Sequence, residues 1–416
     1  MTKILNNKYV VGWRQVSSCF VQLGTISFTS ACYSIMAMPL AAEFQPSRMT
    51  LMMAMTALTG SAALLAPMAG YLMDRVSLRA LMIGGALTMA AGYAVMSFVT
   101  NFVQVLLIYG LIIAPATVML GSMATTVLLT RWFVRKRGAA IGIALAGLSV
   151  ASIVYPPITQ WFIDHNEWRV AFRYIALMLL MVTLPAALLV VDRPSDRGLH
   201  PDGMATSPAE MDGRSGLSPA SISTILRDGS FWLASLTIAI VLSGMAGLVT
   251  SLAPIVMDRG LRASDAAALL SLYGICGLIA KLAFAGVADR FGPRKMLTAS
   301  LIGFALGMTC FSQASLGHEM LIIGVAMAGL FGGLIMPLQS MILPRIFGEE
   351  VVGRVMGLIS IVTFSALLLA PPAFGRVYDV TGSYTAIFYI FTGLSIAALT
   401  TLPWLRLEPK AVMPGS

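Results

Sequence analysis

Apolar blocks long enough to cross a bilayer recur along the whole chain, and they constrain its fold more than any other feature. A helix needs about 20 predominantly apolar residues to span the hydrocarbon core of a membrane. Twelve such blocks with polar or charged ends follow one another: 16–40, 51–73, 80–99, 103–129, 138–163, 171–191, 231–257, 265–288, 296–314, 320–343, 355–374 and 386–405. Charged residues make up only 11% of the 416 residues. The sequence therefore predicts an all-α integral membrane protein with twelve transmembrane helices.

The long polar stretch 192–228 separates the first six blocks from the last six. It contains four prolines, several glycines and serines, and charges of both signs, which is the composition of a flexible linker. We expect an N-terminal six-helix half at 1–191, a cytoplasmic linker at 192–228 and a C-terminal six-helix half at 229–416.

The distribution of Lys and Arg predicts the orientation of the chain. With the N-terminus inside, 20 of the 27 basic residues fall in inside-facing segments and 6 in outside-facing ones. Basic residues concentrate on the cytoplasmic side of membrane proteins. The bias predicts that both termini are cytoplasmic, and it accounts for the net charge of +9 without a nucleic-acid partner.

The two halves share landmarks at one offset of 215 residues. The pairs are Asp74-Arg75 with Asp289-Arg290, Gly138 with Gly353, Gly142 with Gly357, Pro156-Pro157 with Pro371-Pro372, and Asp164 with Asp379. Such coincidence indicates an internal repeat, and parallel six-helix repeats are typical of transporters that rock around a central site.

Two loops carry a resemblance to the major facilitator superfamily. Residues 70–75 with Arg79 resemble the signature loop after the second helix, and residues 289–295 resemble its partner after the eighth. Ser77 and Ala285 stand where glycine is usual. The resemblance implies that Asp74, Arg75, Asp289 and Arg290 take part in gating. The alternative is plain helix capping by Asp in a cytoplasmic loop, and the two roles are compatible.

Within the superfamily, the chain is most similar to the monocarboxylate porters and the related oxalate/formate antiporters. The basic-then-glycine run 132–147 matches their fifth-helix motif, while residues 39–44 with 47–48, and residues 379–384, resemble two further family segments. Glycines at 138, 142 and 147 also suit tight helix packing. The resemblance implies alternating-access transport of a small organic anion, coupled to a proton. Block 355–374 lacks the basic residue of the oxalate-type antiporters, which favours a monocarboxylate over a dianion.

Lys281 is the one charge deep within a predicted span. It precedes Arg290 by nine residues, which places it about 13 Å along the helix at 1.5 Å per residue. In the resembling families this position commonly holds an arginine that binds the substrate carboxylate, so Lys281 keeps the charge but loses the bidentate geometry. Gly277 stands where some of those porters have an aspartate. The alternative is a lysine that snorkels to the cytoplasmic face, and the depth of Lys281 favours a substrate site.

Four neutral side chains complete the predicted substrate site: Tyr33, Tyr155, Tyr273 and Gln339. Each sits in an apolar block and can hydrogen-bond to an acid or hydroxyl group. For any one of them, an ordinary contact between helices is an equally simple explanation.

The sequence motifs indicate neither an enzyme nor a cofactor-binding protein. The loops contain no P-loop, metalloprotease or EF-hand pattern, and the four cysteines form no metal-binding pair. We expect no cofactor and no metal site. An efflux pump for drugs or amphiphilic metabolites is the alternative transporter, and a non-transporting membrane receptor is the alternative outside that class. The short loops and bare termini favour a multi-pass protein of a bacterial inner membrane, and we expect a monomer.

Overall fold

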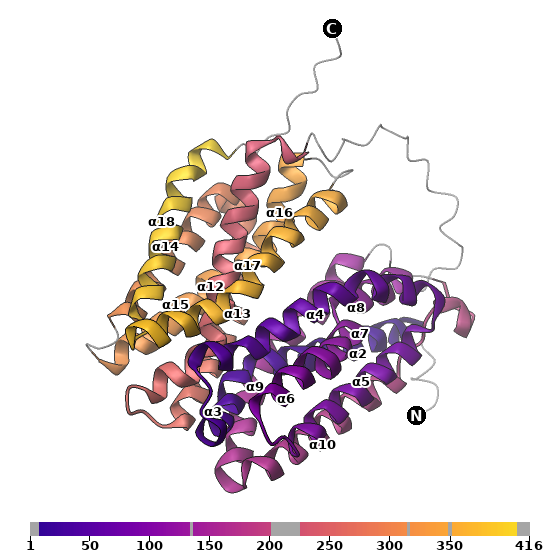
Figure 1. The fold of residues 1–416 in the computed structure, drawn as a ribbon. Helices are drawn as coiled ribbons and strands as arrows, with labels where there is room; N and C mark the ends of the chain where they lie inside the picture. The colour runs from indigo at the N-terminus through magenta and orange to yellow at the C-terminus, as the bar shows by residue number, and fades with distance from the viewer. Residues whose placement is uncertain (1–7, 134–135, 201–224, 314–316, 348–351, 406–416) are drawn as a thin grey trace. The chain divides into compact units, whose positions relative to one another are not determined.

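The computed structural model describes residues 8–133, 136–200, 225–313, 317–347 and 352–405, and these residues form helices and no strand (Figure 1). Within them, twelve helical stretches are long and apolar enough to cross a membrane. The predicted all-α membrane fold with twelve spans is confirmed.

The chain forms two compact units. Unit 1 comprises Met1–Pro46 and Met53–Ser215, and unit 2 comprises Ser47–Met52 and Gly216–Ser416. Much of the predicted linker, residues 201–224, lies outside the described part of the chain. The short segment Ser47–Met52 groups with unit 2 although its neighbours on both sides belong to unit 1, which no sequence pattern predicted.

Unit 1 contains the first six predicted spans. Its helices are α2 (Lys8–Ala31), α3 (Tyr33–Phe44), α4 (Arg48–Arg75), α5 (Leu78–Met96), α6 (Phe102–Ile108), α7 (Ala114–Leu120), α8 (Ser122–Trp132), α9 (Arg137–His165) and α10 (Trp168–Leu188). A π-helical turn, Tyr109–Ile113, joins α6 to α7, and the first turn of α4 groups with unit 2.

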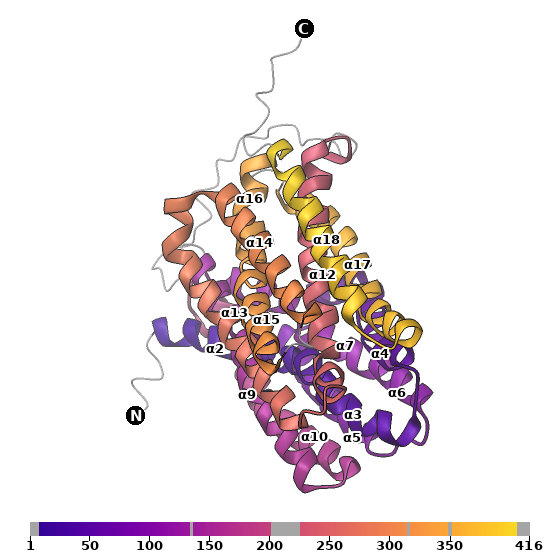
Figure 2. The ribbon, with the colours of Figure 1, turned by 90° about the vertical axis from the view of Figure 1, so that its left-hand side faces the viewer.

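Unit 2 contains the last six spans. Its helices are α12 (Gly229–Met257), α13 (Ala263–Phe291), α14 (Pro293–Ser312), α15 (His318–Gly332), α16 (Ile335–Phe347), α17 (Val352–Thr381) and α18 (Thr385–Thr401). Figure 2 shows α14 beside α18 and α12 beside α17 in this unit, in agreement with their packing.

Corresponding helices pack together in the two units. In unit 1, α2 packs on α9, and α5 packs on both α10 and α7. In unit 2, α12 packs on α17, and α14 packs on both α18 and α15. These are the pairs that a 215-residue offset relates, so the repeat extends from sequence landmarks to helix packing.

Close approach of α2 and α9 depends on one glycine of the fifth-helix motif. A Cβ on Gly147 would lie 2.1 Å from the carbonyl oxygen of Phe20. Only glycine permits backbones this close. A Cβ on Gly142 would meet nothing within 4 Å, so close packing explains Gly147 and does not explain Gly142.

Several spans that the sequence predicts as continuous are interrupted. The first span breaks at Cys32, between α2 and α3, and the tenth breaks after α15. In the fourth span, Pro115 near the start of α7 removes a backbone donor, and the preceding turn is π-helical. Gly121 then adopts extended backbone between α7 and α8. These breaks redirect side chains in the middle of the helices.

Candidate functional site

The predicted binding residue Tyr33 lies in the core of unit 1. Its side chain is 1% exposed at the start of α3, and its ring packs edge-on against Tyr109 at 5.4 Å between centroids. Its predicted contact with substrate stays a prediction, now for a side chain that is buried in this conformation.

Tyr155 on α9 retains more exposure than Tyr33. It is half-buried, and its ring meets Phe28 edge-on at 5.2 Å. Phe28 in turn packs edge-on against Tyr93 at 5.3 Å. Of the two tyrosines predicted in unit 1, Tyr155 is therefore the one whose side chain reaches the surface of the unit.

A buried set of hydroxyl groups lies behind these rings, and the sequence analysis missed it. The Tyr93 hydroxyl donates to Thr29 Oγ1 at 3.2 Å, and both residues are buried. Tyr109 is 1% exposed and starts the π-helical turn. Aromatic residues in apolar blocks resemble ordinary core residues, so their convergence becomes visible only once α2, α5 and the π-helical turn Tyr109–Ile113 are placed.

In unit 2, Tyr273 and Lys281 lie on one stripe of α13. They stand eight residues apart with Gly277 midway, and residues four apart share a helix face. Both side chains are half-buried. The structure thus brings the predicted cation and one predicted tyrosine onto the same side of one helix.

Glycine contacts with α15 determine where this stripe lies. A Cβ on Gly329 would lie 2.6 Å from the Tyr273 carbonyl oxygen, and a Cβ on Gly333 would lie 3.0 Å from the Gly277 Cα. The backbone of α13 therefore packs directly against the C-terminal end of α15. This contact fixes the axial position and rotation of α13, and with them the position of Lys281.

Gln339, the remaining predicted binding residue, lies on α16 just after the break that follows α15. Its side chain is half-buried. The interruption at Gly333 and Leu334 turns the chain between the two helices, so the direction of Gln339 depends on this break as well as on the sequence register.

The predicted gating residues occupy the ends of α4 and α13. Arg75 is exposed, and its guanidinium carbon lies 4.2 Å from the centroid of the Tyr71 ring. The side chains of Asp74, Asp289 and Arg290 lie outside the described part of the structure, although their backbones belong to the two helices.

Two described side chains cap the start of α5 in the first of these loops. Ser77 Oγ accepts a hydrogen bond from the Ala80 N–H at 3.3 Å, and Asp192 Oδ1 accepts from the Arg79 N–H at 2.8 Å. In the sequence, Asp is the expected cap of this loop, and Ser77 stands out only as a departure from the motif. Ser77 is the N-cap of α5, and Asp192, from the start of the predicted linker, adds a second cap.

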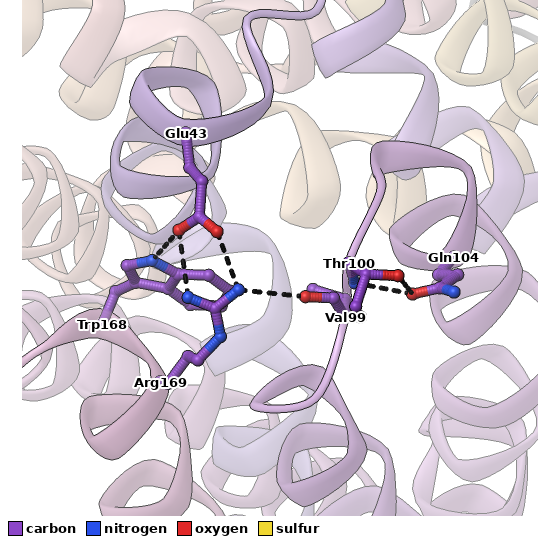
Figure 3. A network of polar contacts seen from close by, with 6 residues as sticks. All are labelled: Glu43, Val99, Thr100, Gln104, Trp168 and Arg169. Atoms are coloured by element: carbon purple, nitrogen blue, oxygen red, sulfur yellow. Dashed lines mark hydrogen bonds and ion pairs between the residues drawn. The ribbon is translucent and has the colours of Figure 1, made fainter.

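An ion-pair network joins the end of α3 to the start of α10 in unit 1 (Figure 3). Glu43, at the end of α3, accepts from Arg169 Nη2 at 2.7 Å and from Trp168 Nε1 at 2.5 Å. Arg169 also donates to the Val99 carbonyl at 3.3 Å. Glu43 thereby joins the C-terminal end of the first span to the start of α10.

Comparison with known proteins assigns the family. A model of the Major Facilitator Superfamily matches residues 19–279 and 247–416. The chain belongs to the Major Facilitator Superfamily. It is accordingly a multi-pass membrane transporter and not an enzyme.

This superfamily member is similar in sequence to several curated transporters. It is 29% identical to monocarboxylate transporter 13 of Bos taurus over 78% of this chain and 73% of that protein. It is 25% identical to monocarboxylate transporter 4 of Gallus gallus, covering 91% and 79%. It is 24% identical to monocarboxylate transporter 12 of Homo sapiens, covering 91% and 77%.

Solved transporters share the fold of this superfamily member. A D-xylose–proton symporter aligns with a TM-score of 0.75 at 15% identity, over 97% of this chain and 98% of that one. A bacterial homolog of the human lysosomal transporter Spinster aligns with a TM-score of 0.66 at 14% identity, over 96% and 95%. At these identities the likeness concerns the fold alone.

Proposed function

We propose that this transporter moves a small organic anion, a monocarboxylate, across the membrane by alternating access and together with a proton. The names of the similar curated proteins support the substrate class, because three of them are monocarboxylate transporters aligned over most of this chain. The residues of the chain supply an independent reason.

The observation that carries the proposal is a cation within an apolar helix. Lys281 is half-buried in α13, ten residues before the end of a 29-residue helix. Ionisable side chains inside membrane spans are costly and are retained where they serve a transport pathway. A carboxylate is the natural ligand for an ammonium group, because a charge-assisted hydrogen bond offsets the desolvation of both partners.

Neutral groups are proposed to orient the acid around Lys281. Tyr273 shares the α13 stripe with it, while Tyr155 on α9 and Gln339 on α16 present half-buried polar ends within their own units. Tyr33 is proposed as a further such group at the start of α3, where its buried ring packs against Tyr109.

The proposal extends to the gate and to the placement of the chain. Asp74, Arg75, Asp289 and Arg290 would stabilise one gate state at the cytoplasmic ends of α4 and α13. The protein would lie in a cell inner membrane as a monomer, with both termini cytoplasmic, as the distribution of basic residues supports.

Counterflow in proteoliposomes tests the substrate class. Vesicles loaded with unlabelled lactate should accumulate labelled lactate when they contain the protein, and a pH gradient should drive net uptake. Oxalate and cationic amphiphiles should compete poorly. Exchange of a cationic amphiphile without exchange of lactate or pyruvate would replace the proposal by the efflux reading, and exchange of none of them would leave it without support.

A further inference from the structure

The first turn of α4 is bound within unit 2, although the rest of the helix belongs to unit 1. The segment Ser47–Met52 groups with unit 2, and the chain from Met53 to Ser215 groups with unit 1. One continuous helix, Arg48–Arg75, is therefore shared by both compact parts of the protein.

A carboxylate of α17 caps this first turn. Asp379 Oδ1 accepts from the Arg48 N–H at 2.9 Å, and Asp379 Oδ2 accepts from the Met49 N–H at 2.9 Å. The first N–H groups of a helix have no partner within the helix, and an anion at this end is favoured by the helix dipole. Asp379 thus caps α4 from 331 positions away, beside the local cap in which Ser47 Oγ accepts from the Thr50 N–H at 3.1 Å.

The Arg48 side chain makes a second polar contact with unit 2. Its Nη2 lies 2.6 Å from Asp258 Oδ1, directly after α12, and its guanidinium carbon lies 5.1 Å from the centroid of the Tyr378 ring. Backbone and side chain of the same turn are therefore held by three different residues of unit 2.

The surface of α17 is shaped to receive this turn. A Cβ on Gly375 would lie 2.5 Å from the Arg48 carbonyl oxygen and 2.6 Å from the Met49 Cα. One turn further, Met52 is fully buried, and its sulfur lies 3.6 Å from Ser251 Oγ on α12. A glycine, a capping carboxylate and a buried methionine contact converge on six residues of chain.

We propose that Asp379 and Gly375 form a releasable latch for the first turn of α4, which docks on unit 2 in one stage of the transport cycle and leaves it in another. The inference rests on the proposed transport by alternating access, which moves the two six-helix halves. It adds the residues that hold and release one end of α4.

Release is favoured over bending for a reason in the sequence of α4. Sharp kinks in helices occur at Pro, at Gly or at π-bulges. The stretch from Arg48 to Thr59 contains neither Pro nor Gly, and the first glycine is Gly60. A docked turn followed by an unkinked helix cannot stay in place while the helix body moves, and its polar contacts can be exchanged for water at the helix end.

A reversible cross-link separates a latch from a static contact. In a chain whose four native cysteines are replaced, Met52→Cys with Ser251→Cys should form a disulfide on oxidation, because the wild-type side chains are in contact. Counterflow of labelled lactate should stop on oxidation and return on reduction. The latch would be overturned if the cross-linked protein exchanged lactate as fast as the same protein after reduction. Failure of the two cysteines to cross-link would also overturn it.

Failure of the proposed substrate is distinguishable from failure of the latch. If the reduced double variant and the wild type both fail to exchange lactate, the substrate assignment is wrong. The latch is then tested by the labelling of a single Met52→Cys in detergent, which requires no substrate.

The labelling test uses two changes that open the latch by different means. Asp379→Ala removes the cap that α17 provides and leaves the local Ser47 cap in place, and Gly375→Ala pushes the turn away sterically, so both should speed maleimide labelling of Met52→Cys several-fold. Gly393→Ala is the control, because a Cβ there meets nothing within 4 Å. Equal labelling rates in all three backgrounds would contradict the proposal.

Discussion

Gly329→Ala tests how the packing of α15 positions the proposed binding lysine. The new Cβ would lie 2.6 Å from the Tyr273 carbonyl oxygen and 3.0 Å from the Cys276 Cβ. Ordinary contacts begin near 3.4 Å, so α13 must move by about 0.8 Å. The obstructing atom is backbone and cannot rotate away, and overpacking of this kind costs about 1–3 kcal/mol.

The displacement should reach Lys281, because it lies two turns along the same rigid helix as Tyr273. Displacement of a positioning group by 1 Å can lower a rate by about 100-fold. We expect the KM for lactate exchange to rise by roughly 10-fold in Gly329→Ala, since a smaller movement of a binding group weakens the contact without removing it.

Thermal unfolding in detergent, followed by lactate exchange, provides the assay. Gly329→Ala should melt below the wild type. Gly393→Ala, an alanine in open space on α18, should be unchanged or more stable by about 0.5–1 kcal/mol, since glycine disfavours helix interiors. If Gly329→Ala matches Gly393→Ala in both melting temperature and KM, the packing argument for Lys281 is refuted.

Three further changes probe other parts of the molecule. Cysteines in 192–228 should react with an impermeant maleimide only from the cytoplasmic side, and cysteines in 164–169 only from outside; the reverse would overturn the orientation. Asp192→Ala should lower the free energy of unfolding by about 0.5–2 kcal/mol, because it removes the side chain that caps the Arg79 N–H; an unchanged free energy of unfolding would refute that role. Glu43→Gln should lower the melting temperature more at low salt than at high salt, since its ion pair is exposed; a salt-independent loss would point to packing instead.

The number of spans could be predicted because the bilayer leaves few alternatives. Each helix must satisfy its own backbone and cover the hydrocarbon thickness, so apolar block length translates directly into spans. The breaks inside spans did not follow from this argument. Block length records neither the break at Cys32 nor the π-helical turn Tyr109–Ile113 that precedes Pro115.

The candidate site was predictable only in part. A charge within an apolar block stands out in any sequence, so Lys281 could be found without the fold. Aromatic residues do not stand out, because packing and binding place them in the same blocks, and the burial of Tyr33 could not be told from its sequence position. Arg48 looked like an ordinary loop charge, since its partners Asp258 and Asp379 are distant along the chain.

The most direct test of the account measures binding and exchange in Lys281 variants. Lactate should raise the melting temperature of the wild type, as expected for a ligand of the native state, and should leave that of Lys281→Ala unchanged. Lys281→Ala should remain monodisperse and lose lactate counterflow, while Lys281→Arg should keep part of it because the charge survives. Wild-type counterflow by Lys281→Ala would contradict the claim that this lysine binds the carboxylate.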